Sequence, residues 1–135
     1  MCWTQCFLIV RYMEGNKKIP LRVCWESKGG SNCCICEKCW RTILAIYAEN
    51  SNSKDFDFIL SKDGLKKVSN KMRYDTYYKL KHPAYAIIQN HFNNNCNKEN
   101  LPKEIQWFYD IDLDKLVNSS IFRKVRNKII RKFIY

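Results

Sequence analysis

Cysteine spacing is the feature that most constrains this chain. Eight of its 135 residues are cysteine, and five of those lie between residues 24 and 39. Four of them follow the pattern C-x8-C-x2-C-x2-C, from Cys24 through Cys33 and Cys36 to Cys39. Clustered cysteines in a cytosolic chain bind metal more often than they form disulfides. We therefore expect one metal site, and we expect the N-terminal third of the chain to fold around it.

Zn²⁺ is the metal that this pattern favours. In structural sites it takes four thiolate or imidazole ligands at the corners of a tetrahedron. Cys36 and Cys39 are three residues apart at the start of an expected helix, so they share one face of it. Free N–H groups at that helix end stabilise thiolate charge, and Lys38 and Arg41 add positive charge nearby. A glycine pair in the preceding loop lets the chain turn back toward Cys24.

Other interpretations of the cysteines remain open. The run C-x2-C-x2-C also occurs in ferredoxins, although the Cys-Pro that completes their pattern does not follow here. The thiols could also carry no metal or form disulfides. Cys34 competes with Cys33 as a ligand, and we prefer Cys33 because it gives the regular spacing. The remaining cysteines are expected to be packing or incidental thiols; they are Cys2, Cys6 and Cys96.

Apolar periodicity predicts a mainly α fold with a short β element, in one small domain built around the four-cysteine zinc knuckle. Residues 1–50 are expected to form the zinc-knuckle segment, with a strand over 20–25, a loop, and a helix over 35–48. Residues 51–135 are expected to complete the same domain as a helical segment. Its predicted helices span 65–81, 83–91, 102–109 and 112–132, with a turn at Asp63-Gly64 and an asparagine-rich loop over 92–97.

The predicted C-terminal helix is strongly basic. Residues 119–135 contain no acid, in a chain whose net charge is +11. Apolar residues at 122, 125, 129 and 133 recur with helical spacing, so this helix could dock on the domain and leave its basic face in water. It could instead bind an anionic surface, either nucleic acid or lipid headgroups. The candidate anion-binding residues are Arg41, Arg123, Lys124, Arg126, Lys128, Arg131 and Lys132.

The cysteine region resembles a known signature. Residues 21–25 (LRVCW) and 32–45 (NCCICEKCWRTILA) resemble the pattern vCw…NCgxCeKCxRTmlAl of bacterial proteins related to PP-loop ATP pyrophosphatases. The cysteine spacing is also similar to the C-terminal zinc site of 7-cyano-7-deazaguanine synthase. This resemblance covers about residues 20–48 and implies the same four zinc ligands. It further implies a nucleotide-binding PP-loop domain or chain as the partner.

Two departures from that family limit what the resemblance implies. Cys34 stands where the family usually has glycine. The phosphate-binding pattern Ser-Gly-Gly-x-Asp-Ser is absent, because residues 27–32 (SKGGSN) interrupt it with a lysine and lack the acid. We therefore expect a non-catalytic structural zinc-binding domain, a truncated or accessory C-terminal part of such an enzyme. The alternative is a nucleic-acid-binding zinc protein that uses its basic C-terminal helix.

The other polar residues indicate no catalytic centre. His82 is expected at a helix boundary and His91 at a helix end, where it would cap carbonyl groups. Asp110, Asp112 and Asp114 alternate as cation ligands sometimes do, but helix N-capping by Asp112 or Asp114 is the preferred interpretation. The sequence has neither a signal-peptide pattern nor a stretch of about 18 apolar residues that could span a bilayer. We expect a cytoplasmic protein, and the sequence does not indicate its oligomeric state.

Overall fold

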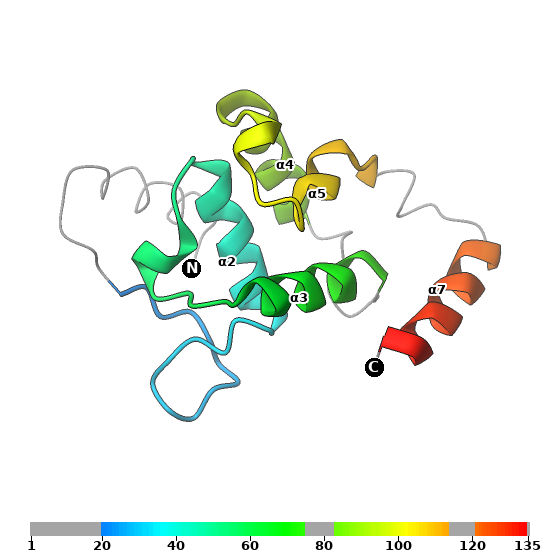
Figure 1. Cartoon of the computed structure of the whole chain (residues 1–135), viewed down its shortest axis with the longest axis horizontal. Helices are drawn as coiled ribbons and strands as arrows, with labels where there is room; N and C mark the ends of the chain where they lie inside the picture. The colour runs from blue at the N-terminus through cyan, green and yellow to red at the C-terminus, as the bar shows by residue number, and fades with distance from the viewer. Residues whose placement is uncertain (1–19, 75–82, 114–120, 135) are drawn as a thin grey trace.

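A computed structural model describes residues 20–74, 83–113 and 121–134 (Figure 1). The described part of the chain is mainly helical, which confirms that prediction. Its α-helices and 3-10 helices are, in chain order, α2 (Glu37–Ala48), η1 (Ser53–Phe56), α3 (Lys62–Tyr74), α4 (Pro83–Asn95), η3 (Lys98–Asn100), α5 (Gln106–Asp110) and α7 (Ile121–Ile134).

Helix α2 lies at the centre of the described core. It buries most of its residues, and it packs against α4 in the most extensive contact between described helices (Figure 1). Trp40 of α2 is fully buried, and its indole N–H donates to the sulfur of Met72 in α3. Phe108 of α5 meets the ring of Phe92 in α4 edge-on, with 5.7 Å between centroids. The first turn of α2, which carries Cys39, is therefore part of the same packed core.

The predicted strand over 20–25 is wrong, because no strand occurs among the residues that the structure describes. The segment is extended and keeps the alternation that suggested a strand, with Leu21 and Val23 buried and Arg22 exposed. A strand also needs a ladder of backbone hydrogen bonds. Here the Leu21 N–H donates to the Phe56 carbonyl at 3.4 Å. The side chain of Asn32, rather than a second strand, accepts the amides of Val23 and Cys24.

Helix boundaries differ from the predicted ones where side chains cap the backbone. Helix α2 begins at Glu37 rather than at residue 35, because the Cys36 sulfur caps it by accepting the Cys39 N–H. The predicted turn at Asp63-Gly64 is instead the first turn of α3. The Ser61 hydroxyl accepts the Gly64 N–H at 3.0 Å and starts that helix.

The later helices also differ in length from the predictions. Helix α4 continues to Asn95, through two thirds of the predicted asparagine-rich loop, because Phe92 is buried on its core-facing side. Helix α5 is shorter than predicted. Of the helix predicted over 112–132, residue 113 and residues 121–132 are helical, and α7 continues to Ile134. Predictions for residues 1–19, 75–82 and 114–120 lie outside the described residues. Among the helices that are described, none is long and apolar enough to cross a membrane.

Candidate metal centre

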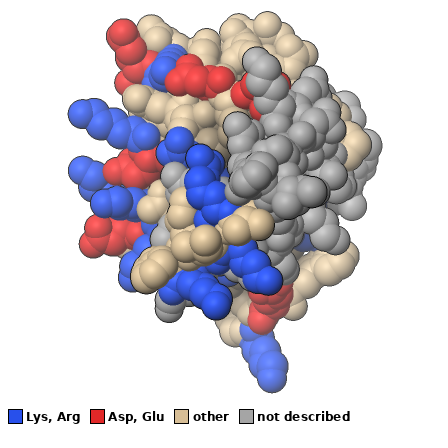
Figure 2. Space-filling view, turned by 90° about the vertical axis from the view of Figure 1, so that its right-hand side faces the viewer, with Lys and Arg blue, Asp and Glu red and all other residues tan. Residues whose placement is uncertain are grey.

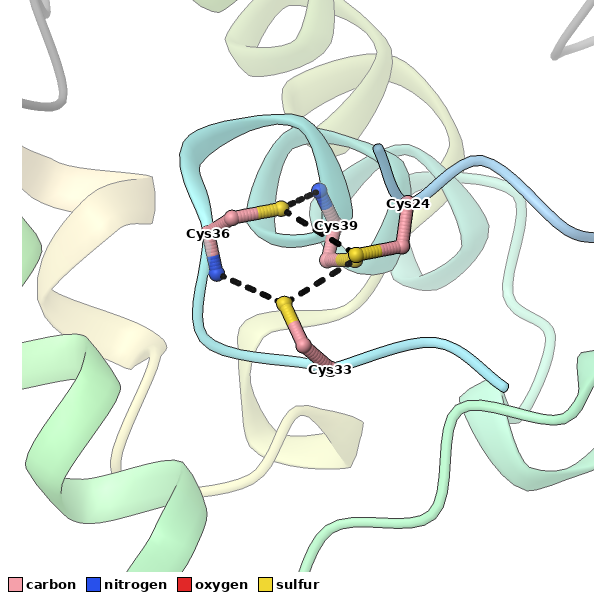
Figure 3. A group of neighbouring side chains, drawn as sticks. All are labelled: Cys24, Cys33, Cys36 and Cys39. Carbon is pink, nitrogen blue, oxygen red and sulfur yellow. Dashed lines mark hydrogen bonds between the residues drawn. The ribbon is translucent and has the colours of Figure 1, made fainter. Parts of the chain in front are cut away.

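Four cysteine sulfurs converge at the N-terminus of α2 (Figure 3). The Sγ atoms of Cys24, Cys33, Cys36 and Cys39 all lie within 4.8 Å of one another. Cys24 and Cys36 are 4.0 Å apart, and Cys33 and Cys39 are 3.9 Å apart. A tetrahedral ion with Zn–S bonds of about 2.3 Å holds its sulfurs about 3.8 Å apart. The observed spacings therefore match a single ion at the centre of the group.

Three local structures supply the four side chains. Cys24 comes from the extended segment, Cys33 from the loop that follows, and Cys36 and Cys39 from the cap and first turn of α2. Cys33 is partly exposed and the other three are buried. Among the described residues, no other group of three or more His, Cys, Asp or Glu side chains is comparably placed for a metal ion.

Backbone amides already face two of the sulfurs. The Cys36 N–H donates to Cys33 Sγ, and the Cys39 N–H donates to Cys36 Sγ, each at 3.4 Å (Figure 3). These donors favour the thiolate form, and they fix the direction from which each sulfur would meet an ion. The free N–H groups of the helix start were expected to act in this way, and these two contacts do so.

The thiols differ in how readily they lose a proton. Burial opposes ionisation of Cys24, but hydrogen bonds from the backbone and thiol of Cys33 and from nearby loop amides lower the pKa of Cys24 to about 6. Burial raises the pKa of Cys36 to about 11, and burial likewise raises the pKa of Cys39 above its ordinary range. A metal ion must displace the protons held at neutral pH, so its binding weakens as the pH falls.

Asn32 joins the two arms of the site. Its Oδ1 accepts the Val23 N–H at 3.0 Å and the Cys24 N–H at 3.3 Å, and its Nδ2 donates to the Leu21 carbonyl at 2.7 Å. One side chain thereby satisfies three backbone groups of the extended segment. Because Asn32 directly precedes Cys33, these bonds hold Cys24 and Cys33 next to each other. No local sequence pattern predicts this role, because the three bonds cross eight to eleven residues.

Replacement of Asn32 tests that positioning role. Asn32→Ala leaves two amides and one carbonyl without their partner, which should lower the free energy of unfolding by about 1–3 kcal/mol. Loss of an outer hydrogen bond to a ligand-bearing segment should also weaken metal binding about 10–100-fold. Competition with a chromophoric chelator measures the affinity, and Asn32→Asp, which keeps the acceptor, should lose less. Equal affinities for all three proteins would contradict the role.

Cys34 lies outside the group of four sulfurs. Its backbone is left-handed, with φ of 58°, and its buried sulfur lies 3.5 Å from the Asn32 carbonyl oxygen. Glycine adopts this conformation without strain, whereas a residue with a β-carbon does so less readily. Burial raises the pKa of the Cys34 thiol. Of the two adjacent candidates, the structure brings Cys33 into the group and leaves Cys34 out of it.

Two basic residues predicted to assist the thiolates contact other groups instead. Lys38 Nζ lies over the ring of exposed Trp25, 3.6 Å from its centroid. Arg41 Nε pairs with Glu37 Oε1 at 2.6 Å, and the Tyr85 hydroxyl donates to the same oxygen. Glu37 therefore links α2 to α4 through Tyr85, with Arg41 on the same carboxylate, and the anion-binding role of Arg41 stays a prediction.

The C-terminal candidates for anion binding lie on α7. Arg126, Lys128 and Lys132 are exposed there. The backbone of α7 also includes Arg123, Lys124 and Arg131, whose side chains are outside the described structure. The structure therefore separates these residues from Arg41 and places them on one helix.

A second polar cluster joins the C-terminal ends of α2 and α4. His91 Nδ1 lies 2.7 Å from Oε1 of buried Glu49, and the Asn95 amide reaches the same oxygen. His91 was predicted to cap carbonyl groups, and it binds a carboxylate instead. The Cys96 thiol donates to the carbonyls of Tyr47 and Ala48, at 3.0 and 3.3 Å. These contacts fix α4 against α2 and hold the helix that carries the cysteines.

The three alternating aspartates do not form a cation site among the described residues. Asp110 is the last residue of α5 and forms an ion pair with Lys98. The predicted roles of His82 and Asp114 lie outside the described residues.

Comparison of the chain with family models, curated proteins and solved structures found no match, so the assignment of the metal centre depends on its own geometry and chemistry.

Proposed function

We propose that Cys24, Cys33, Cys36 and Cys39 bind one structural Zn²⁺ ion. The observation that carries this proposal is the convergence of four sulfurs within 4.8 Å of one another, with two of the pairs at 3.9 and 4.0 Å, near the edge of about 3.8 Å of a zinc tetrathiolate. An iron–sulfur cluster fits less well, because its cysteines bind different iron atoms and do not surround one centre. Thiolates are the ligands that zinc sites of this structural class use.

The role that we propose for the ion is to hold the loop against the helix. Residues 20–36 have little regular structure, and the four ligands connect this stretch to the start of α2. Four protein thiolates fill a tetrahedral zinc ion, so no position remains for water or substrate. The proposed site is accordingly non-catalytic, and its contribution is to the folding of the segment.

We further propose that the domain acts as an accessory to a PP-loop nucleotide-binding partner, as the resemblance over residues 20–48 implies. The loop that imitates a phosphate-binding motif lies inside the metal loop, where Ser27 donates to the Ser31 carbonyl. Its residues are thus used in closing the loop between Cys24 and Cys33. A neighbouring reading frame with Ser-Gly-Gly-x-Asp-Ser, whose purified product binds this chain, would support the proposal. ATP hydrolysis by this chain alone would contradict it.

Cobalt substitution tests the proposed coordination directly. Titration of the reduced, metal-free protein with Co²⁺ should produce the visible bands of tetrahedral cobalt and thiolate charge-transfer absorption, saturating at one ion per chain. One equivalent of Zn²⁺ should then remove both. Cys33→Ser should lose part of the charge-transfer absorption, whereas Cys34→Ser should keep all of it. Octahedral bands, or equal losses in the two variants, would contradict four-cysteine coordination.

A further inference from the structure

Helix α7 exposes an apolar stripe that the described part of the fold leaves uncovered. Val125, Ile129 and Phe133 are 52%, 53% and 85% exposed. They are four residues apart, so at about 100° per residue they share an arc of about 80° on the helix. Helix α7 contacts α3, yet this stripe faces water. Helices on globular domains usually turn such a stripe toward the core, so its exposure points to a binding partner.

Positive charge borders the stripe on both sides. Helical geometry places Lys128 and Lys132 at one edge and Arg126 at the other, and all three are exposed. The neighbouring helix α3 adds exposed Lys62, Lys66 and Lys67, with Asp63 as its one acid. Figure 2 shows Lys and Arg side chains gathered around uncharged residues on the face that includes α7.

We propose that this face, formed by the stripe of α7 and its basic borders, binds an anionic membrane surface. A bilayer with acidic lipids accepts apolar side chains at the acyl boundary, and its headgroups pair with lysine and arginine beside them. Long basic side chains can extend from the edges of a buried stripe to the headgroups. The helix would lie in the plane of the interface, and the metal site would not take part.

Two other occupants match only part of the surface. A nucleic acid offers phosphates to Arg126, Lys128 and Lys132, but its backbone provides no place for Val125 and Ile129. A second copy could cover the stripe, but it would bring the same positive charges together. A membrane surface with acidic lipids provides favourable contacts for both the apolar and the basic residues.

Vesicle co-sedimentation tests the proposal. The zinc-loaded protein should bind vesicles of phosphatidylcholine with phosphatidylglycerol, and should bind weakly to phosphatidylcholine alone. Each basic residue at an acidic surface contributes about fivefold in affinity, so Lys128→Gln with Lys132→Gln should weaken binding about 25-fold. Ile129→Gln with Phe133→Gln should weaken it about tenfold or more. Every substituted side chain is exposed, and Ile129 is the least so, at 53%. The fold should therefore tolerate the changes.

Matched controls separate this face from general charge and general apolarity. Lys54→Gln with Lys103→Gln removes the same charge from exposed positions elsewhere, and Ile87→Gln alters a 44% exposed residue of α4. Both controls should bind nearly as the parent does. Absence of binding to acidic vesicles, or equal losses in controls and test variants, would overturn the proposal. The proposal would also be overturned if the protein formed a dimer that the Ile129→Gln with Phe133→Gln variant dissociates. Nucleic-acid binding in place of vesicle binding would overturn it as well.

Discussion

Cys36→Ser is expected to abolish stable zinc binding and to unfold the segment from residue 20 to the start of α2. Cys36 is both a ligand and the residue whose sulfur caps α2, so the substitution removes two functions at once. Structural zinc contributes an apparent binding free energy of about 10–16 kcal/mol, which is as large as the stability of a whole domain, about 5–15 kcal/mol. Hydrogen exchange should therefore show residues 20–40 losing protection, with metal analysis showing little zinc.

The matched control for this experiment is Cys34→Ser. Cys34 is also buried and lies two residues away, but its sulfur is outside the group of four. The control should keep one zinc per chain and nearly the protection of the parent. If Cys36→Ser retained full zinc and the same protection, the proposed ligand set would be wrong.

Trp40→Ala should lower the free energy of unfolding by about 3–5 kcal/mol. Trp40 directly follows Cys39, the last of the four clustered cysteines. It is fully buried and contacts Met72 of α3. Its removal leaves a cavity between the metal-bearing turn and the helical core. Because the site and the core share this residue, zinc release and loss of helical signal should occur together in a urea titration.

Trp25→Ala serves as the control, since it removes the same ring from the surface. Trp25 is 85% exposed, and its contact with Lys38 is of a kind that contributes about 0.5–1 kcal/mol. The stability of this variant should stay within that range of the parent. Zinc release at a lower urea concentration than core unfolding would show that the two parts do not fold as one unit.

The cysteine group could be predicted from sequence because its ligands are local. Three of the four fall within seven residues, and the geometry of a helix start fixes how Cys36 and Cys39 face each other. The helices could be predicted for the same reason, since the apolar face of a helix repeats every three or four residues. The structure also resolves the choice between Cys33 and Cys34, which sequence left open, through the left-handed backbone at Cys34.

Contacts between residues distant in the sequence could not be predicted from it. The segment over 20–25 alternates as a strand does, but a strand requires a partner, and here Asn32 accepts its amides instead. Nothing local to His91 indicated that it would meet Glu49 across two helices. The apolar spacing of α7 likewise predicted an amphipathic helix, but it could not say whether that stripe would face the core or water.

Elemental analysis tests most directly whether the four cysteines hold a single zinc ion. The protein should be purified under reducing conditions and measured for zinc and iron together with protein concentration. We predict one zinc per chain and negligible iron, with the zinc lost in Cys36→Ser. A chain that is folded but holds no zinc, or that holds iron in its place, would contradict the account.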